Sequence, residues 1–322
     1  MRIGLIGCGN HSNKVYAPSL LRYRREHPDT LLAGCCDINR QNAELFAQRV
    51  GFERSYTDYK EMLEKEQPDA VMLITPYHIT ARMASEMFEK GCPVFIEKPP
   101  GASFDECREL VDLLKTKPCL HQVAFNRRHI PVIRRLKRDI TEKNTPMQHI
   151  DYQMYRIKRL DSDFYATAVH GVDLVCNLAR GNCMEASFMY KELNQFGSGV
   201  MNILIQLLFD SGMTAQLSFC PVSGEVMERL TVTTDGGTYF VNTPMWSNSD
   251  NGELIFRNKD IQEALSASDG DAMFESNGFW HQLDSFFEHV REGKQPADSL
   301  FTCLDTMRLV DLIRTKESRY LR

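Results

Sequence analysis

The chain of 322 residues lacks the features that mark membrane and secreted proteins. No stretch approaches the roughly 20 consecutive apolar residues that a membrane-spanning helix requires. The apolar run at the N-terminus, Met1–Gly7, is too short for a secretory signal, and no small-residue cleavage site follows it. From the sequence we therefore expect a cytoplasmic protein with no membrane partner.

Cysteine occurs ten times, but in no pattern that indicates a metal site or a disulfide framework. There is no Cys-x-x-Cys motif, and most cysteines lie singly beside apolar residues, as buried thiols do. We expect no bound metal, because several histidines show no metal-ligand spacing and are assigned ordinary structural roles: His27, His121, His129, His149, His281 and His289.

The sequence also has no excess of basic residues. Lys and Arg total 38 against 43 for Asp and Glu, which gives a formal net charge of −5 and no long-range attraction for nucleic acid. The basic run Arg134–Arg138 lies on a helical pattern and is interpreted as a solvated face. We expect no nucleic-acid partner.

What is present is an alternating α/β pattern over the first 125 residues. Short apolar runs alternate with amphipathic stretches, which predicts a doubly wound parallel sheet covered by helices. The predicted strands are Arg2–Gly7, Leu31–Cys36, Ala70–Thr75, Pro93–Glu97 and His121–Phe125. The predicted helices are Lys14–Arg25, Arg40–Val50, Tyr59–Glu66, Ile79–Lys90 and Phe104–Lys115. We assign residues 1–124 to a Rossmann domain that binds a dinucleotide.

Residues 125–322 form a second domain of a different character, an α+β domain with an open, mostly antiparallel sheet. Asp210-Ser211-Gly212 and Asp235-Gly236-Gly237 each join two strand patterns and predict hairpins. The predicted strands are Gln148–Lys158, Val200–Phe209, Met213–Phe219, Arg229–Thr234 and Gly237–Val241. The predicted helices are Ile130–Lys143, His170–Leu178, Phe274–Glu292 and Phe301–Lys316.

A glycine-rich turn directly follows the first predicted strand. It reads Gly7-Cys8-Gly9-Asn10-His11-Ser12, which is the fingerprint G-x-G-x-x-G with serine in the last place. The first glycine permits a tight turn, the second lets the backbone approach a pyrophosphate, and the third position needs a small residue. Because the next helix offers N–H donors to phosphates, the turn predicts a dinucleotide site that includes Asn10, His11 and Ser12.

Asp37, which ends the second predicted strand, supports the same site. An acid there accepts hydrogen bonds from a ribose hydroxyl and repels a 2′-phosphate, so it favours NAD. Arg40 keeps NADP open, because an arginine nearby can receive that phosphate. The alternative for Asp37 is a cap on the following helix.

A lysine follows the fourth predicted strand in Glu97-Lys98-Pro99-Pro100. Ligands bind at the carboxyl ends of parallel strands, so Lys98 is predicted to point toward a ligand. The prolines stop the strand, and a cis peptide before Pro99 is expected.

Together these motifs resemble the glucose–fructose oxidoreductase / inositol 2-dehydrogenase / rhizopine-catabolism (Gfo/Idh/MocA) family, and the resemblance covers nearly the whole chain. It rests on Gly7-Cys8-Gly9-Asn10, Thr75-Pro76, Glu97-Lys98-Pro99, Phe125-Asn126-Arg127-Arg128, Gln282–Phe287 and Arg291–Pro296. The resemblance implies that Lys98 contacts cofactor and substrate, that Thr75 and Pro76 line the cofactor, and that His78 lies near the ribose or nicotinamide. It also implies subunit contacts through the open sheet, so we expect a homodimer or homotetramer.

His170 is the candidate proton acceptor, since histidine titrates near working pH. The family pattern is Asp-x-x-x-His-x-x-Asp, which His170 and Asp173 match, whereas Ala166 stands where the first Asp is expected. Asp163 or Tyr165 could supply the missing group. The alternative for His170 is a structural histidine paired with Asp173, three residues away on one helical face.

Three further side chains are candidate substrate contacts. Arg127 and Arg156 could meet a polar or acidic group, although solvated charges are the alternative for Arg156, and Asp173 is either a substrate contact or structural. The sequence therefore predicts an NAD(P)-dependent oxidoreductase acting on a sugar, cyclic polyol or sugar-derived acid. Two alternatives stay open because of Ala166: a sensor that binds cofactor without turnover, and a redox-neutral glycosidase or dehydratase that uses NAD transiently.

Overall fold

A computed structural model describes residues 1–245, 252–259, 261–265, 267–268 and 270–322. The chain forms two compact units, each built on one sheet. The first unit comprises Met1–Phe125 and Phe279–Leu304, and the second comprises Asn126–Gly278 and Asp305–Arg322. The domain boundary that we placed after residue 124 stays a prediction; in this division the later segment Phe279–Leu304 groups with the first unit.

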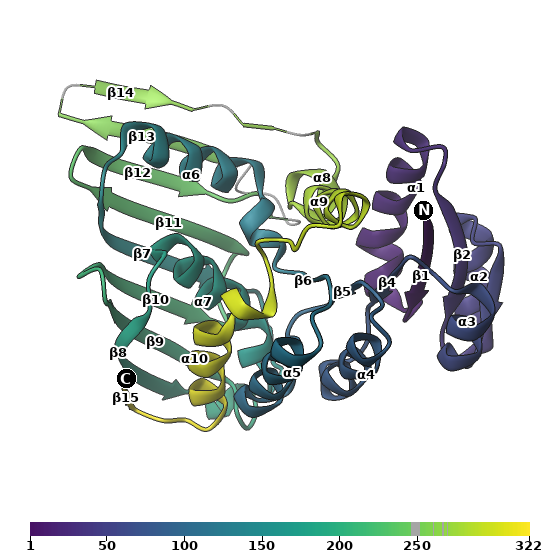
Figure 1. The fold of residues 1–322 in the computed structure, drawn as a ribbon. Coiled ribbons are helices and arrows are strands. Elements are labelled where there is room, and N and C mark those ends of the chain that lie inside the picture. Colours follow the sequence, from purple (N-terminus) through teal and green to yellow (C-terminus); the bar gives the residue numbers. More distant parts are fainter. Residues whose placement is uncertain (246–251, 260, 266, 269) are drawn as a thin grey trace. The chain divides into compact units, whose positions relative to one another are not determined.

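The first unit contains a six-stranded sheet, in which every neighbouring pair is parallel (Figure 1). The strand order is β3-β2-β1-β4-β5-β6. The strands are β1 (Arg2–Ile6), β2 (Leu31–Cys36), β3 (Arg54–Tyr56), β4 (Ala70–Leu73), β5 (Val94–Ile96) and β6 (His121–Val123). The helices are a π-helix (Ser12–Tyr16), α1 (Ala17–Glu26), α2 (Arg40–Val50), α3 (Tyr59–Glu66), α4 (Tyr77–Glu89), α5 (Phe104–Thr116), α9 (Phe279–Glu292) and a 3-10 turn (Leu300–Thr302).

Local sequence explains these elements. All four residues of β4 are buried, as in a parallel sheet whose two faces are covered. Asn39 begins α2 by accepting hydrogen bonds from the backbone N–H groups of Gln41 and Asn42, and Gly51 ends it with φ +88°. The doubly wound parallel sheet is confirmed. Strand β3 was not predicted, since only three residues form it and two of them are exposed polar residues.

The second unit contains a nine-stranded mixed sheet of order β14-β13-β12-β11-β7-β10-β9-β8-β15. Among the described strands of this second sheet, β7 and β10 are the one parallel pair. All other neighbouring strands of the sheet pair in antiparallel fashion. The strands are β7 (Met147–Tyr155), β8 (Cys183–Glu192), β9 (Met201–Phe209), β10 (Thr214–Cys220), β11 (Met227–Thr234), β12 (Gly237–Asn242), β13 (Glu253–Asn258), β14 (Ile261–Ala264) and β15 (Arg319–Leu321). The helices are α6 (Pro131–Lys143), α7 (Tyr165–Ala179), α8 (Met273–Ser276) and α10 (Leu304–Arg314), with 3-10 turns at Asn126–His129 and Asn194–Phe196.

Both predicted hairpins are confirmed, since β9 pairs with β10 and β11 with β12 in antiparallel fashion. Strands β8, β13, β14 and β15 were not predicted. In β8 buried and exposed residues do not alternate regularly, and the apolar side chain of Met189 is 66% exposed. The strand therefore lacks the strict alternation of apolar and polar residues from which a strand is predicted.

Two helix predictions need correction. The helix expected over His170–Leu178 begins earlier, at Tyr165, so His170 lies in its second turn. The single helix expected over Phe274–Glu292 is interrupted at Gly278, which has φ +78°. A Cβ there would lie 2.5 Å from the backbone oxygen of Asn126, so the glycine allows a close backbone approach that no periodicity reveals.

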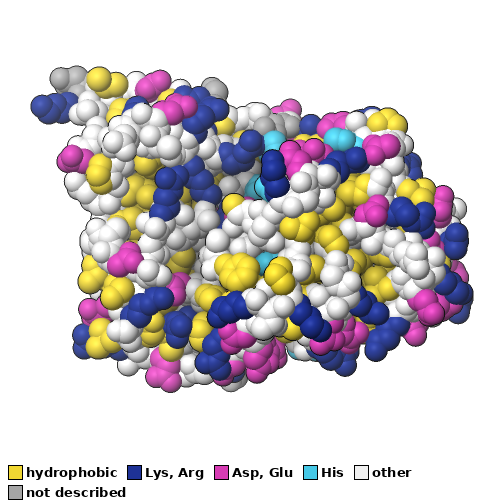
Figure 2. Space-filling view, viewed as in Figure 1, with side chains coloured by type: hydrophobic (Ala, Val, Ile, Leu, Met, Phe, Trp, Pro, Cys, Tyr) yellow, Lys and Arg dark blue, Asp and Glu magenta, His cyan; other side chains and the backbone are white. Residues whose placement is uncertain are grey.

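Helices α6 and α7 pack on one face of the second sheet (Figure 1). On the surface in view in Figure 2, Lys and Arg side chains are interspersed with Asp and Glu side chains. In the described part of the chain, no helix combines the length and the apolar character needed to cross a membrane. The ten cysteines form no disulfide in these described residues.

Candidate functional site

Most of the predicted cofactor residues of the first unit gather at one edge of its sheet. They follow the carboxyl ends of β2, β1, β4 and β5, which are neighbours in that order. Backbone hydrogen bonds join these ends: Gly7 N–H donates to Cys36 O (2.8 Å), Ile74 N–H to Ile6 O (2.8 Å), and Glu97 N–H to Leu73 O (2.9 Å). The strand order reverses between β1 and β4, which is where ligands bind in open α/β sheets.

The glycine turn has the geometry that a dinucleotide requires. Gly7 has φ +99°, and a Cβ there would lie 2.0 Å from the backbone oxygen of Ile74, so only glycine fits. Gly9 is exposed, and a Cβ added there would meet nothing within 4 Å. The space beside Gly9 is therefore open to a phosphate, which is the role predicted for the second glycine. Buried Ser12 closes the turn by donating its hydroxyl hydrogen bond to Gly7 O.

The helix after the turn begins with an unpredicted π-turn over Ser12–Tyr16, and such bulges often occur at functional sites. Asn10 and His11 are exposed beside it. The side-chain amide of Asn13 donates to Cys8 O (2.9 Å) and Gly9 O (3.0 Å), which fixes the turn. Sequence reasoning missed Asn13, because it lies one residue beyond the fingerprint.

Asp37 is tied directly to the glycine turn. Its Oδ2 accepts a hydrogen bond from Cys8 N–H (2.8 Å), and its Oδ1 accepts one from Asn39 N–H (2.9 Å). The cap of α2 is Asn39 rather than Asp37, so the alternative of a helix cap at Asp37 is wrong. Arg40 is exposed, and its Nη1 lies 3.9 Å from Oε1 of Glu44, one helical turn along α2.

The next loop carries Thr75, Pro76 and His78 at the start of α4. The Thr75 hydroxyl lies 3.0 Å from the Thr80 hydroxyl, and Pro76 caps the helix. Thr75 is half-buried, whereas Pro76 and His78 are exposed. These positions leave all three side chains at the carboxyl edge of the sheet, and their contact with a cofactor stays a prediction.

Glu97 forms the most constrained part of this edge. Its Oε2 accepts a hydrogen bond from the hydroxyl of Tyr16 (2.5 Å) and lies 3.5 Å from His11 Nε2. Burial alone would raise the pKa of Glu97, but the charges of His11 and Lys98 and the Tyr16 hydroxyl hold it below its ordinary value. Burial and the neighbouring Glu97 raise the pKa of Tyr16, so Tyr16 stays a donor. No sequence signal links Tyr16 to Glu97, because 81 residues separate them.

Lys98 follows Glu97 directly and is half-buried. The expected cis peptide between Lys98 and Pro99 is confirmed. The backbone from which Lys98 extends is held by the hydrogen bond that Glu97 N–H donates to Leu73 O (2.9 Å).

In the second unit, α7 carries the predicted proton acceptor. His170 is buried at 9% exposure, and Tyr165 is half-buried at the first residue of the helix. Ala166 N–H donates to Asp163 O (2.8 Å), so Asp163 lies at the entrance of the same helix. Both residues proposed to replace the missing aspartate are thus near Ala166 in the fold.

Two of the predicted substrate contacts, Arg127 and Arg156, form buried ion pairs with Glu228. Arg127 donates two hydrogen bonds to Glu228 (2.8 and 3.2 Å), and Arg156 donates to the same carboxylate. Arg156 is 4% exposed, so the alternative of a solvated strand-end charge is wrong for it. A role of Arg127 or Arg156 in substrate binding stays a prediction, and the structure gives both a place in the core of the second unit.

Asp173 is held in the same way by the neighbouring arginine. Arg128 donates to its two oxygens (2.8 and 2.6 Å), and the Thr306 hydroxyl donates to Oδ1 (3.3 Å). The pair fastens α7 to the 3-10 turn at Asn126–His129. The structure thus gives Asp173 a structural role, and contact with substrate stays a prediction.

The structure brings the predicted cofactor residues together within the first unit and His170, Tyr165 and Asp173 onto one helix within the second. Lys98 and His170 belong to different units, and their joint action on one substrate stays a prediction. The first unit fits NAD, since an open glycine backbone, a helix start and a fixed carboxylate surround one edge.

Comparisons with known proteins agree with this geometry. Residues 1–125 match the family described as "Oxidoreductase family, NAD-binding Rossmann fold". The chain is 26% identical over 328 residues to a 4-carboxy-2-hydroxymuconate-6-semialdehyde dehydrogenase from Sphingobium sp., with 96% of each chain covered. It is also 26% identical over 290 residues to a scyllo-inositol 2-dehydrogenase (NAD(+)) from Bacillus subtilis, with 84% of this chain and 81% of the relative covered.

The fold is shared with solved structures. A dehydrogenase from Chromobacterium violaceum superposes with a TM-score of 0.85 at 20% identity, over 98% of this chain and 95% of that chain. The family match covers the predicted cofactor residues of the first unit, and the relatives extend the similarity over both units. Residues 1–125 thus match the Gfo/Idh/MocA oxidoreductase family, whose NAD-binding Rossmann fold supports NAD as the cofactor.

Proposed function

We propose that this protein oxidises a carbinol carbon of a sugar, cyclic polyol or sugar-derived acid, or reduces the corresponding carbonyl, with NAD as hydride carrier. The observation that carries the proposal is the fixed carboxylate of Asp37 beside the open backbone of Gly9. When bound, NAD supplies the hydride acceptor or donor. The protein then has to bind the nucleotide, orient the substrate and move one proton.

The nucleotide would be held by the backbone of the glycine turn and by the carboxyl edge around it. Gly9 leaves room for the pyrophosphate, and the helix start supplies N–H donors. Asp37 already accepts a hydrogen bond from the turn, and its carboxylate retains lone pairs for a ribose hydroxyl. A 2′-phosphate in that place would meet a negative charge, which supports NAD over NADP despite exposed Arg40.

Lys98 and His170 would have two different roles toward the substrate. The Lys98 ammonium donates a hydrogen bond to the reacting oxygen and stabilises the negative charge that develops there. Neutral His170 accepts the hydroxyl proton during oxidation and returns it during reduction. Tyr165 or Asp163, beside Ala166, would orient the substrate or the imidazole where other members carry an aspartate.

The substrate panel follows from the relatives' names. One relative is a dehydrogenase of a cyclic polyol and another is a dehydrogenase of a semialdehyde. A hydrated aldehyde also carries hydrogen and hydroxyl on one carbon, so the same proton and hydride transfers apply to both classes. The panel should therefore hold inositols, sugars, sugar acids and semialdehydes.

A homodimer or homotetramer is part of the proposal. Large apolar side chains stand on the outward face of the second sheet: Met189 is 66% exposed, Leu204 41%, and Leu208 and Phe240 39% each. An apolar face of this kind is typical of a subunit interface. We propose a cytoplasmic location as well, because ten cysteines that follow no disulfide framework in the sequence suit a reducing compartment.

The sharpest test of the nucleotide site is Gly9→Ala. A methyl group there meets no protein atom within 4 Å, so stability should change by no more than about 0.5 kcal/mol. It would fill the space required by the pyrophosphate, so we expect at least a tenfold loss of NAD affinity by fluorescence titration. Gly224→Ala, at another open glycine, is the control and should bind NAD as the parent does. Unchanged affinity in Gly9→Ala would refute the site.

The catalytic assignment is tested on the same panel by nicotinamide absorbance. Lys98→Ala and His170→Ala should each lower turnover while the protein still binds NAD. Unchanged turnover in both variants would remove the assignment. Binding of NAD with no absorbance change on any substrate would favour the sensor, and bond cleavage without net absorbance change would favour the redox-neutral enzyme.

A further inference from the structure

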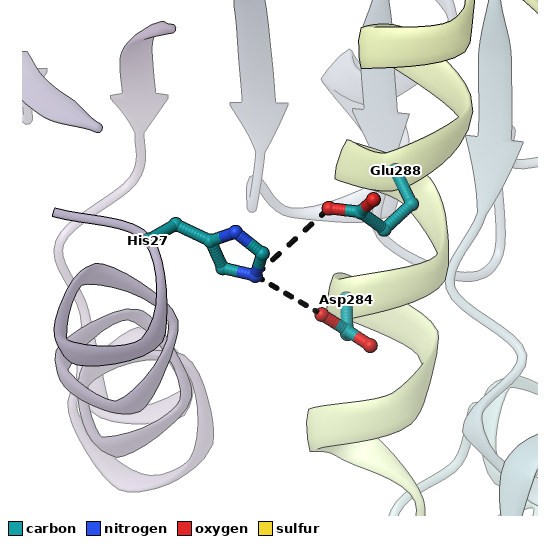
Figure 3. Close-up of side chains that lie close together, drawn as sticks. All are labelled: His27, Asp284 and Glu288. Carbon is teal, nitrogen blue, oxygen red and sulfur yellow. Dashed lines mark ion pairs between the residues drawn. The ribbon is translucent and has the colours of Figure 1, made fainter. Parts of the chain in front are cut away.

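A cluster of metal-ligating side chains lies in the first unit, outside the residues assigned to NAD. His27 follows the last residue of α1, and Asp284 and Glu288 stand one turn apart on α9. Figure 3 shows the imidazole of His27 directed toward the two carboxylates, which both face it from α9. In the described part of the chain, this is the one group of three or more His, Cys, Asp or Glu side chains whose ligand atoms come together closely enough to hold an ion.

The distances are too long for direct hydrogen bonds but suit an ion between the groups. His27 Nε2 lies 3.9 Å from Asp284 Oδ1 and 3.9 Å from Glu288 Oε1, and all three atoms lie within 4.8 Å of one another. An N–H···O hydrogen bond spans only about 2.7–3.2 Å. Ligands bonded tetrahedrally to Zn²⁺ at about 2.1 Å are about 3.4 Å apart, so each His–carboxylate distance would shorten by about 0.5 Å.

The histidine is held in place by its neighbours. The ring of His27 stacks on Tyr23, with centroids 4.2 Å apart and planes 25° apart, and Tyr23 is fully buried. The Tyr23 hydroxyl in turn accepts a hydrogen bond from Arg291 Nε (3.0 Å) and lies 3.5 Å from Glu288 Oε1. The stack on this buried tyrosine restrains the imidazole that faces the carboxylates.

The cluster itself contributes two negative charges. Asp284 and Glu288 place their carboxylates on the side of α9 that faces His27, and the carbonyl end of α1, where His27 lies, adds a partial negative charge. Arg291 donates two hydrogen bonds to Asp29 (2.8 and 3.2 Å) and has its Nε 3.8 Å from Glu288 Oε1.

We propose that His27, Asp284 and Glu288 form a binding site for a divalent transition-metal ion, of which Zn²⁺ is the representative. One imidazole nitrogen and two carboxylate oxygens suit Zn²⁺, with water as the fourth ligand, whereas Ca²⁺ and Mg²⁺ prefer oxygen ligands alone. The ion joins the end of α1 to α9, so it ties the segment Phe279–Leu304 to the N-terminal part of the first unit. From the sequence we expected an ordinary structural role for His27 and no bound metal, because His27 and Asp284 are 257 positions apart in the chain.

The test uses full-length protein stripped with a chelator and titrated with ZnCl₂ by calorimetry. We expect one Zn²⁺ per chain with a dissociation constant below about 100 µM, and a rise in unfolding temperature when Zn²⁺ is added. Glu288→Gln keeps the size of the side chain, and it should lower Zn²⁺ affinity at least tenfold and abolish the thermal shift. His27→Ala should do the same, but it also removes the stack on Tyr23, so Glu288→Gln decides the result.

His149→Ala is the matched control, since His149 Nε2 faces a single carboxylate, Asp151, at 3.5 Å in the second unit. It should bind Zn²⁺ as the parent does. Cobalt(II) spectra separate this site from thiol ligation, because a cysteine ligand adds an intense sulfur-to-metal charge-transfer band. Equal Zn²⁺ affinity in Glu288→Gln and the parent, a cobalt spectrum with thiolate bands, or no binding below 1 mM Zn²⁺ would each overturn the proposal. None of these measurements depends on NAD or on turnover.

Discussion

Replacing Glu228 by glutamine should destabilise the second unit strongly at neutral pH. Glu228 on β11 is fully buried, and the guanidiniums of Arg127 and Arg156 both bind its carboxylate. Glutamine keeps the shape of the side chain but removes the negative charge that both guanidiniums bind. Removing one partner of a buried ion pair costs about 3–5 kcal/mol, because the remaining charge is desolvated without compensation.

The lowered pKa of Glu228 leads independently to a loss of the same order. Burial by itself would raise this pKa, but the charges of Arg127 and Arg156 outweigh burial and lower it from 4.5 to about 2. At 1.36 kcal/mol per pKa unit, the difference corresponds to about 3 kcal/mol. The two arguments therefore agree on a loss of about 3 kcal/mol or more.

The sign of the pH dependence follows from the lowered pKa. The unfolded chain binds the proton of this carboxyl more tightly than the folded protein does, so the stabilisation is complete above about pH 4.5 and is lost as the pH falls toward 2. The difference in unfolding free energy between the parent and Glu228→Gln should thus be about 3 kcal/mol at pH 7. It should shrink to about 1 kcal/mol at pH 3.

Urea unfolding followed by circular dichroism measures this difference at pH 7, 5 and 3. Glu225→Gln, an exposed change three residues earlier on the chain, is the control and should stay within about 0.5 kcal/mol of the parent. A loss below 1 kcal/mol at pH 7, or an equal loss at pH 7 and pH 3, would refute the role assigned to the Glu228 ion pairs.

Three further substitutions test local features by thermal or urea unfolding. Gly7→Ala would place a Cβ 2.0 Å from the oxygen of Ile74 at φ +99°, so it should cost at least about 2 kcal/mol and weaken NAD binding. Gly171→Ala would place a Cβ 2.2 Å from the buried ring of Tyr152, and overpacking of this kind should cost about 1–3 kcal/mol. Asn39→Ala removes the cap of α2 and should cost about 1 kcal/mol.

Each of these has a matched control. Gly9→Ala serves for Gly7, and Gly224→Ala for Gly171, since a Cβ at either control position meets nothing within 4 Å. Asn42→Ala, an exposed change on α2 itself, serves for Asn39. If a test variant unfolds at the same urea concentration as its control, the contact assigned to that residue does not contribute to stability.

Much of the first unit could be predicted from the sequence because its determinants are local. A buried parallel strand such as β4 is continuously apolar, and α2 and α3 coincide with the stretches predicted from their amphipathic spacing. The glycine fingerprint occupies six consecutive residues, so the chain itself places it after β1. The position of Asp37 is local in the same sense, since this residue directly follows the neighbouring strand β2.

Other features depended on residues that are distant in the chain. The Tyr16–Glu97 hydrogen bond joins residues 81 positions apart, and the Arg127–Glu228 pair joins residues 101 apart. Periodicity reports which face of an element is buried, but it does not report which buried charges meet. The buried position of Arg156 could not be predicted for this reason, because no residue near it in the sequence indicates that Glu228 lies beside it.

The sequence by itself determined most of the strands and helices of the first unit, the glycine turn after β1, and the resemblance to a family. These rest on hydrophobic period, glycine geometry and short motifs, which act over a few residues. Only the tertiary structure decided that Phe279–Leu304 groups with the first unit, and it alone brought His27 to Asp284 and Glu288. Such contacts arise from packing between segments far apart in the chain, and no local pattern encodes them.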